Sequence, residues 1–303
     1  MCNIEYKVGG HKLIFSYNPT VNLFFHTLNL YGLLGSHGRA YGLRTDENAV
    51  KTVIPEIYEQ VKDGDWFFSY GKNGVYCSGM ECILKNGLWK EYPDFSRHKI
   101  TADTECFIPA YEACWDGFYK KYWAEHSEKS GENFRKDIES FDWQDMLEKM
   151  QLAAQQKLFT DIYAFSAEAA ANSGMTYSDN VTIGSGGDMA VVHEGLHLLL
   201  REKWAEDERI KKLLEAKPFD RDKMHYSNYV KYYEQALVLT LEHIILGCEN
   251  KLEESFRSCG VQELYGIAYP TVKDYYESGC KASLEDVMLE IIKASDLCQG
   301  RTS

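Results

Sequence analysis

The sequence predicts an α+β protein with a mixed α/β N-terminal lobe, residues 1–130, and a mainly helical C-terminal lobe, residues 131–303. Short runs of branched and aromatic residues between glycines predict strands in the first lobe. From about residue 104 onward, apolar residues recur at helical spacing. The polar stretch 127–133 interrupts that pattern, so we place the boundary between the lobes there.

Composition and charge limit the kinds of partner. The chain has 303 residues, 45% hydrophobic and 26% charged, as expected of a folded globular protein with a full core. A net charge of -13 disfavours nucleic acid, because a polyanion would be repelled. No apolar run reaches the length of a membrane span. We therefore expect neither a nucleic-acid nor a membrane partner, and the sequence leaves the oligomeric state unknown.

The cysteines predict a reducing compartment. There are nine, an odd number, and none forms a C-x-x-C pair. Reduced thiols in a cytoplasmic protein are the better interpretation than a disulfide framework. The N-terminus shows no basic start followed by an apolar core, as a signal peptide would, although a leader trimmed earlier would leave no trace in the sequence.

The N-terminal lobe begins with a predicted hairpin and helix. Residues 5–8 and 12–17 read as strands around the tight turn Gly9-Gly10. Asn18 and Pro19 then provide a helix cap and first helical position for residues 21–31. Further along we expect a glycine-rich surface loop at 32–42 with no phosphate-binding pattern. A helical segment should follow at 46–62, with a kink or boundary at Pro55. We then expect short strands at 65–70, 74–77 and 82–84, and a His98 that is exposed to solvent.

The C-terminal lobe carries mainly helical patterns. Asp142 is the expected cap of a helix, and residues 158–165 fit either a strand or the start of a helix. Residues 180–184 form a clearer strand. Helices are expected at 229–246, 251–258, 271–278 and 283–297, the last capped by Ser283.

The central feature is the pattern His193-Glu194-Gly195-Leu196-His197 within an apolar segment that we expect to be helical from 189 to 205. A spacing of four places both imidazoles on one helix face, where they can bind a single metal ion. Glu194 then lies where its carboxylate can reach a metal-bound water. The alternative is that both histidines are satisfied core residues and Glu194 is a surface carboxylate. Burying these groups without a partner is costly, which favours the metal site.

On these residues the chain resembles zincin-type zinc metallopeptidases. The resemblance implies that His193 and His197 are ligands of zinc (Zn2+) and that Glu194 is the general base. It covers residues 180–240, and the N-terminal half matches no family pattern. The metzincin branch is excluded, because its pattern requires glycine and histidine where this chain has Leu200 and Lys203.

A catalytic zinc site usually has three protein ligands. In the gluzincin branch, which the chain resembles more, the third ligand is a Glu from a following helix, and Glu234 interrupts an apolar helical segment there. Glu234 is therefore the expected third ligand. The position four residues later is Val238 and not the Asp of many gluzincins, so a carboxylate that orients a ligating His must come from elsewhere or be absent. Competing ligand candidates are Glu206, Asp207, Glu215, His225, Glu242 and His243.

The expected chemistry is hydrolysis of peptide bonds in a peptide or protein substrate. Zinc activates water and polarises the carbonyl, while Glu194 transfers the proton to the leaving amine. A strand edge at 181–183 is expected to pair with the extended substrate. Two alternatives stay open, a non-catalytic binding or scaffold protein that keeps this fold and a metal-dependent hydrolase of a non-peptide bond. Candidates for the donor to the oxyanion are His225, Tyr229, Tyr232 and Tyr233.

Overall fold

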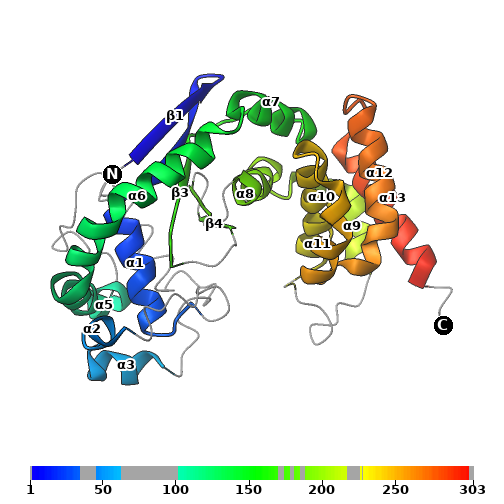
Figure 1. The fold of residues 1–303 in the computed structure, drawn as a ribbon. Coiled ribbons are helices and arrows are strands. Elements are labelled where there is room, and N and C mark those ends of the chain that lie inside the picture. Colours follow the sequence, from blue (N-terminus) through cyan, green and yellow to red (C-terminus); the bar gives the residue numbers. More distant parts are fainter. Residues whose placement is uncertain are drawn as a thin grey trace. The chain divides into compact units, whose positions relative to one another are not determined.

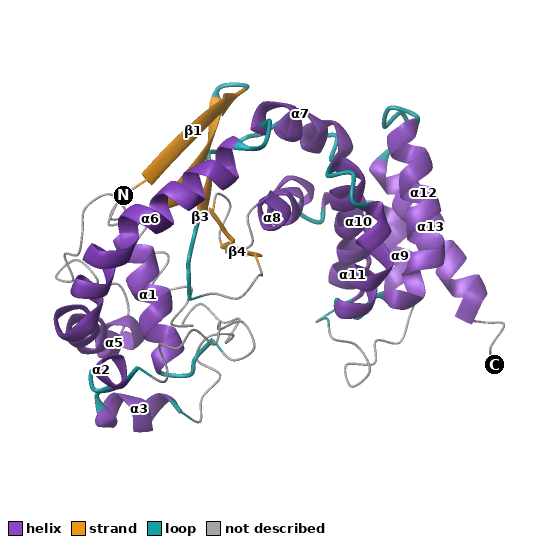
Figure 2. Ribbon diagram, in the orientation of Figure 1, coloured by secondary structure: helices purple, strands orange, loops and turns teal. Residues whose placement is uncertain are grey.

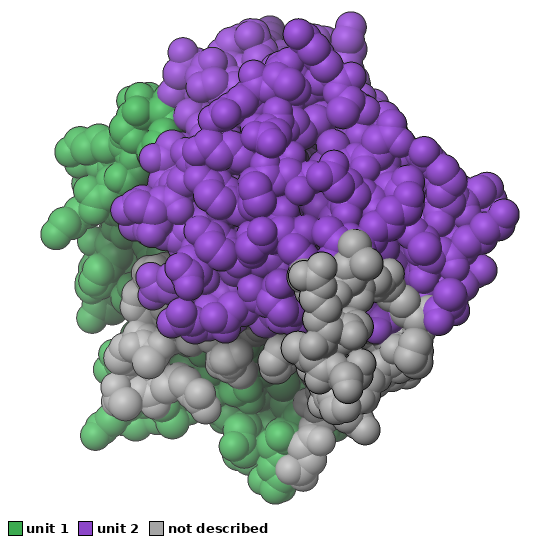
Figure 3. All heavy atoms as spheres, turned by 90° about the vertical axis from the view of Figure 1, so that its right-hand side faces the viewer, with its two compact units in different colours: residues 1–6, 12–141, 161–191 green, residues 7–11, 142–160, 192–303 purple. Residues whose placement is uncertain are grey.

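The structure is a computed structural model that describes residues 2–34, 46–62, 102–169, 174–177, 181–184, 188–216, 226 and 228–299. The strands expected at 65–70, 74–77 and 82–84 lie outside the described residues, as do His98, His225 and most of the loop at 32–42. The chain forms two compact units (Figure 3). Unit 1 contains residues 1–6, 12–141 and 161–191, and unit 2 contains residues 7–11, 142–160 and 192–303.

A five-stranded mixed sheet combines strands from residues 2–17 with strands from residues 162–184 (Figure 2). Its strand order is β1-β2-β3-β5-β4, formed by Cys2–Val8, His11–Tyr17, Ile162–Phe165, Val181–Gly184 and Gly174–Tyr177. The β2–β3 and β3–β5 pairs are parallel, and β4 is antiparallel to β5. The hairpin predicted around Gly9 and Gly10 is confirmed, and both glycines have the positive φ that a tight turn favours.

The strand β5 differs from its expected role. It was expected to offer a free edge at 181–183, but it lies inside the sheet, between β3 and β4. Its residues pair with β3 on one side and with β4 on the other. Among the described strands β4 is the edge strand at this end of the sheet, so the proposed pairing of a peptide with β5 is wrong.

Helix α1, Pro19–Leu30, is buried along its whole length. It starts as the sequence predicts, because the Asn18 side chain accepts a hydrogen bond of 3.0 Å from the backbone N–H of Val21 and Pro19 occupies the first helical position. The other helices of unit 1 are α2 (Glu47–Val50), α3 (Pro55–Val61), α5 (Ala102–Cys114), the π-helical turn η4 (Trp115–Tyr119) and α6 (Lys120–Glu139) (Figure 1). Pro55 begins α3, so the expected kink is a boundary.

The polar stretch 127–133, where the sequence predicted the lobe boundary, lies inside helix α6 of unit 1. Helix α6 is mostly exposed, and its polar residues form a solvated face, which in sequence resembles a linker. Gly131 is one of its few buried residues. A Cβ added there would lie 3.6 Å from the Tyr17 ring, so α6 packs closely on the end of β2.

Unit 2 is mainly helical, as expected of the C-terminal part of the chain (Figure 1). It contains α7 (Trp143–Ala153), most of α8 (Asp188–Leu200), η5 (Lys203–Glu206), α9 (Glu208–Glu215), α10 (Tyr229–Ile245), η6 (Glu249–Lys251), α11 (Leu252–Ser258), η7 (Gln262–Leu264), α12 (Tyr265–Glu277) and α13 (Leu284–Gln299). The predicted caps Asp142 and Ser283 both accept bonds from the first turn of their helices. Among the described helices, none has the length and apolarity needed to cross a membrane.

Helix α8 ends earlier than the sequence predicts. It stops at Leu200 and not at 205, because Arg201 and Glu202 adopt left-handed backbone angles, with φ of 46° and 57°. The chain then continues as the 3-10 helix η5. This break turns the backbone N–H of Glu202 toward α10, where it has a specific acceptor described below.

His26 is an unusual buried residue of α1. Its side chain is 1% exposed, and neither ring nitrogen has a hydrogen-bond partner among the described residues. The imidazole lies against Phe118 and Tyr119, with ring centroids 5.5 and 4.7 Å away. Burial lowers the pKa of His26 from 6.5 to about 3, against the smaller opposite effect of the Asp46 charge.

His26 makes the protein acid-sensitive. The unfolded chain binds a proton at His26 more strongly than the folded chain does. The contribution of His26 to the free energy of unfolding is therefore fully present above pH 6.5 and is lost as the pH falls from there toward 3. Between about pH 7 and about pH 5 we expect the wild type to lose about 2 kcal/mol more unfolding free energy than His26→Leu. Urea titrations at the two pH values measure this difference. His126→Leu, at an exposed position, is the control, and equal losses in wild type and His26→Leu would refute the assignment.

Candidate metal centre

The two histidines of the pattern lie on one face of α8, as the helical spacing predicts. Their ring centroids are 5.0 Å apart and the rings meet edge to face at 73°. The His193 and His197 side chains keep 18% and 19% of their surface exposed, so each imidazole has one open side. Both histidines belong to unit 2.

Gly195 explains how α8 is held. A Cβ added at this glycine would lie 2.4 Å from the Cε of Met150, the end of a flexible side chain of α7, so the Met150 methyl packs directly against the glycine. Leu196, next to it, is fully buried. The face of α8 that carries Gly195 therefore contacts α7 through the Met150 side chain.

Two carboxylates of α10 form hydrogen bonds with the Nδ1 atoms of the two imidazoles. Glu242 Oε2 lies 2.7 Å from His193 Nδ1, and Glu234 Oε1 lies 2.9 Å from His197 Nδ1. The two carboxylates are 3% and 1% exposed. They are eight residues apart on α10, about two helical turns, so they project from the same face of that helix.

These bonds fix which ring nitrogen carries the proton. An ionised carboxylate only accepts hydrogen bonds, so the Nδ1 of each histidine must donate. In the neutral ring Nε2 then keeps its lone pair, the form in which histidine binds a metal. A carboxylate behind the ligating histidine is also the usual support of metal sites, since it sets the orientation and basicity of the ring. His193 and His197 therefore offer two nitrogen donors of the type that binds a metal ion, one fewer than the three protein ligands of a usual catalytic zinc site.

Glu234 lies behind His197, and both its oxygens are engaged. Oε1 accepts from His197, while Oε2 accepts from the backbone N–H of Glu202 at 3.0 Å and from Trp204 Nε1 at 3.2 Å. As a third metal ligand Glu234 would have to give up some of these bonds. This arrangement supports an orienting role, and its role as a ligand stays a prediction.

Glu242 has the same kind of position behind His193. Because Val238 replaces the Asp of many gluzincins, the orienting carboxylate was expected to come from elsewhere or to be absent. The structure places it one turn further along α10, at Glu242. Two buried Glu at a spacing of eight in an apolar helix were the available sequence signal, since a buried carboxylate requires a partner.

Glu194 and Gln235 both act on the His193 ring. Glu194 is 9% exposed, and its charge acts on His193. Burial lowers the pKa of His193, but the bond to Glu242 and the charges of Glu194 and Glu242 outweigh it, so the pKa is raised above its ordinary value. The amide nitrogen of Gln235 lies 3.3 Å from His193 Nε2, a contact that the sequence did not indicate.

The other ligand candidates have different partners. His243 is fully buried, with Nδ1 bonded to the Leu239 carbonyl and Nε2 to the Ser255 hydroxyl at 3.0 Å. Asp207 caps α9 and pairs with Arg209. Glu215 is exposed at the end of α9. Among the described residues no group of three or more His, Cys, Asp or Glu side chains is arranged to hold a metal, so a third ligand is not identified there.

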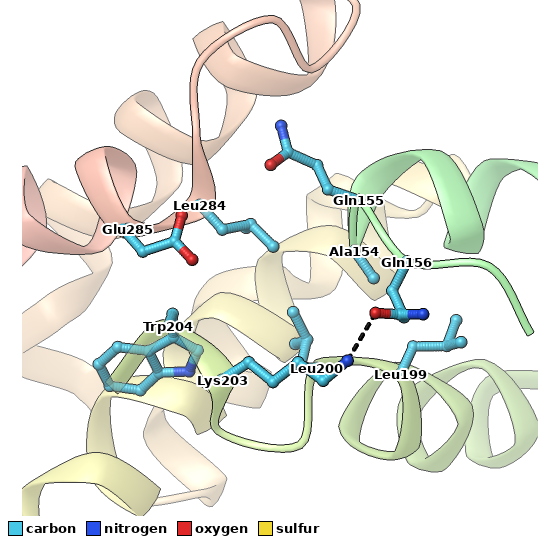
Figure 4. Close-up of a pocket in the computed structure, with 9 residues that line it drawn as sticks. All are labelled: Ala154, Gln155, Gln156, Leu199, Leu200, Lys203, Trp204, Leu284 and Glu285. Atoms are coloured by element: carbon cyan, nitrogen blue, oxygen red, sulfur yellow. Dashed lines mark hydrogen bonds between the residues drawn. The ribbon is translucent and has the colours of Figure 1, made fainter. Parts of the chain in front are cut away.

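A pocket of about 230 Å³ lies beyond Trp204 and does not include the histidines (Figure 4). Lys203 crosses one side of it to bond Gln156 Oε1 at 2.6 Å. Ligand pockets usually have about 300 Å³ or more, so this pocket is small for a substrate site. The pocket is linked to the histidines through Trp204, which lines it and donates a hydrogen bond to Glu234.

Comparison of the chain with models of known protein families, with curated proteins and with solved structures gives no match. The structure is mixed α and β, which agrees with the coarse fold class and is not specific to the zincin fold. The function must therefore be inferred from the geometry of His193, His197 and their partners.

Removing Glu234 is expected to destabilise unit 2. In Glu234→Ala, three buried or half-buried donors lose their acceptor, and the free energy of unfolding should fall by about 3 kcal/mol. Urea unfolding followed by tryptophan fluorescence measures the change. Glu290→Ala, at an exposed site on α13, should stay within about 0.5 kcal/mol of wild type. Equal stability of both variants would show that these bonds do not form in solution.

Proposed function

We propose that the protein is a zinc-dependent hydrolase that cleaves peptide bonds, with His193 and His197 as metal ligands and Glu194 as general base. The observation that carries the proposal is the pair of carboxylate–histidine contacts, which leave two Nε2 lone pairs on one helix face. Burying two carboxylates on one helix only for packing would cost considerable free energy of desolvation. A bound metal ion would explain why two buried carboxylates orient both imidazoles.

The residues divide the work at the site. Zinc held there supplies an activated water and polarises the substrate carbonyl. Glu242 and Glu234 orient the rings of His193 and His197 and keep the Nδ1 proton in place. Glu194, one residue after His193, takes a proton from the attacking water at its carboxylate and delivers it to the nitrogen of the leaving amine.

The class of substrate rests on the resemblance to zincins. Because β5 is paired on both sides, an argument from strand pairing at 181–183 no longer favours a peptide. A test of the function must therefore offer an ester substrate beside peptides. Cleavage of the ester alone would support the hydrolase of a non-peptide bond.

Metal content and activity of three variants test the proposal. The wild type should bind about one zinc per chain, and His193→Ala and His197→Ala should lose it. Glu194→Gln should keep the zinc while kcat/KM on a peptide library falls by at least about 100-fold. His126→Ala, at an exposed site on α6, should resemble wild type.

Two results would contradict the proposal. Substoichiometric zinc in the wild type after purification without chelators would remove the metal. Cleavage that is unchanged in Glu194→Gln would remove the general base. Stoichiometric zinc without cleavage of any substrate would instead support the binding protein that keeps the metal.

A further inference from the structure

Gln235 approaches the one nitrogen of His193 that a metal would use. Its amide nitrogen lies 3.3 Å from His193 Nε2, while Glu242 binds Nδ1 on the other side of the ring. In the neutral His193 ring with its proton on Nδ1, Nε2 is an acceptor, so the Gln235 amide is oriented with its N–H toward it. The hydrogen-bond network therefore assigns the orientation of this amide.

The position of Gln235 on α10 makes this contact specific. Gln235 and Glu242 are seven residues apart, about two turns, and both reach the same imidazole from one face of the helix. The Gln235 side chain is half-buried, so its amide borders the open side of the histidines. Gln235 also acts on the Cys259 thiol, lowering its pKa against the larger effect of burial, which raises it.

A metal ion and the Gln235 N–H compete for one lone pair. Zinc binds a histidine nitrogen at about 2.0 to 2.1 Å, so a bound ion would displace an amide nitrogen that lies 3.3 Å from the same atom. The amide is tethered to α10 and lies close enough to Cys259 to affect the pKa of its thiol. A rotation of the amide would then leave its N–H donor beside the histidines.

We propose that Gln235 is the hydrogen-bond donor to the substrate carbonyl oxygen as negative charge develops on it. The proposal rests on the function proposed above and names the donor that hydrolysis requires in addition to the metal. Two of the tyrosines considered from the sequence, Tyr232 and Tyr233, fit this task less well. The Tyr233 hydroxyl bonds to Ser295 of α13, and Tyr232 is 3% exposed.

Replacing Gln235 by Met tests the proposal, because Met has a similar length and helix propensity but no N–H donor. We expect kcat on the best peptide or ester to fall by about 100-fold or more, with KM nearly unchanged. Zinc affinity, measured by competition with a chelating dye, should be equal to wild type or about threefold to tenfold tighter, because the competing hydrogen bond is gone. Gln235→Leu is the second variant, and Gln262→Met, at an exposed site, is the control.

The outcomes separate the two proposals. A normal kcat in folded Gln235→Met, with a zinc-binding and active wild type, would overturn the role of Gln235 and leave the hydrolase intact. Zinc affinity that falls more than about tenfold would also overturn it, since Gln235 would then be a metal ligand. A wild type that binds no zinc would overturn both proposals, and the zinc content of His193→Ala beside wild type identifies this case.

Discussion

The need of two buried carboxylates for hydrogen-bond donors organises the candidate site. Glu234 and Glu242 project from an apolar helix and are almost completely buried, where an unpaired carboxylate would be costly. The histidines of α8 meet this need through their Nδ1 protons. The same bonds set the tautomer and direction of each ring, so the stability of α8 on α10 and the geometry for binding a metal depend on one interaction.

The surroundings of Glu234 show how local backbone serves this interaction. The left-handed turn at Arg201 and Glu202 ends α8 and points the Glu202 N–H at Glu234. Trp204, in the 3-10 helix that follows, adds its indole N–H to the same oxygen. Arg201 lies over the Phe159 ring, 3.8 Å from its centroid, which supports the turn from outside. The short segment after α8 therefore supplies two further donors to Glu234, the carboxylate that orients His197.

The sequence predicted what depends on local patterns. Period and capping residues located α1, α7 and α10, and the spacing of four correctly placed His193 and His197 on one face. The partner of each histidine was not predictable, because it depends on how α10 packs against α8. Glu234 was recognised as a buried carboxylate in need of a partner, and a metal was inferred where the structure supplies donors.

Long-range pairing explains the larger differences in the fold. The strands β3 and β5 lie more than 140 residues after β2 and still join its sheet, so a boundary drawn along the chain could not describe the two units. The exposed polar face of α6 looked like a linker, since solvated helices and loops share composition. The interior position of β5 follows from β4, a four-residue strand with too few residues for a pattern.

The most direct test of the account is the protonation of the imidazoles of His193 and His197. Long-range proton–nitrogen NMR spectra of protein labelled with nitrogen-15 histidine distinguish the two tautomers, and His193→Ala and His197→Ala assign the signals. At a pH above the raised pKa of His193, we predict that both neutral rings carry the proton on Nδ1, and that added zinc shifts the Nε2 signals while Nδ1 stays protonated. Protonated Nε2 atoms, or zinc-induced loss of the Nδ1 protons, would contradict the arrangement described for this site.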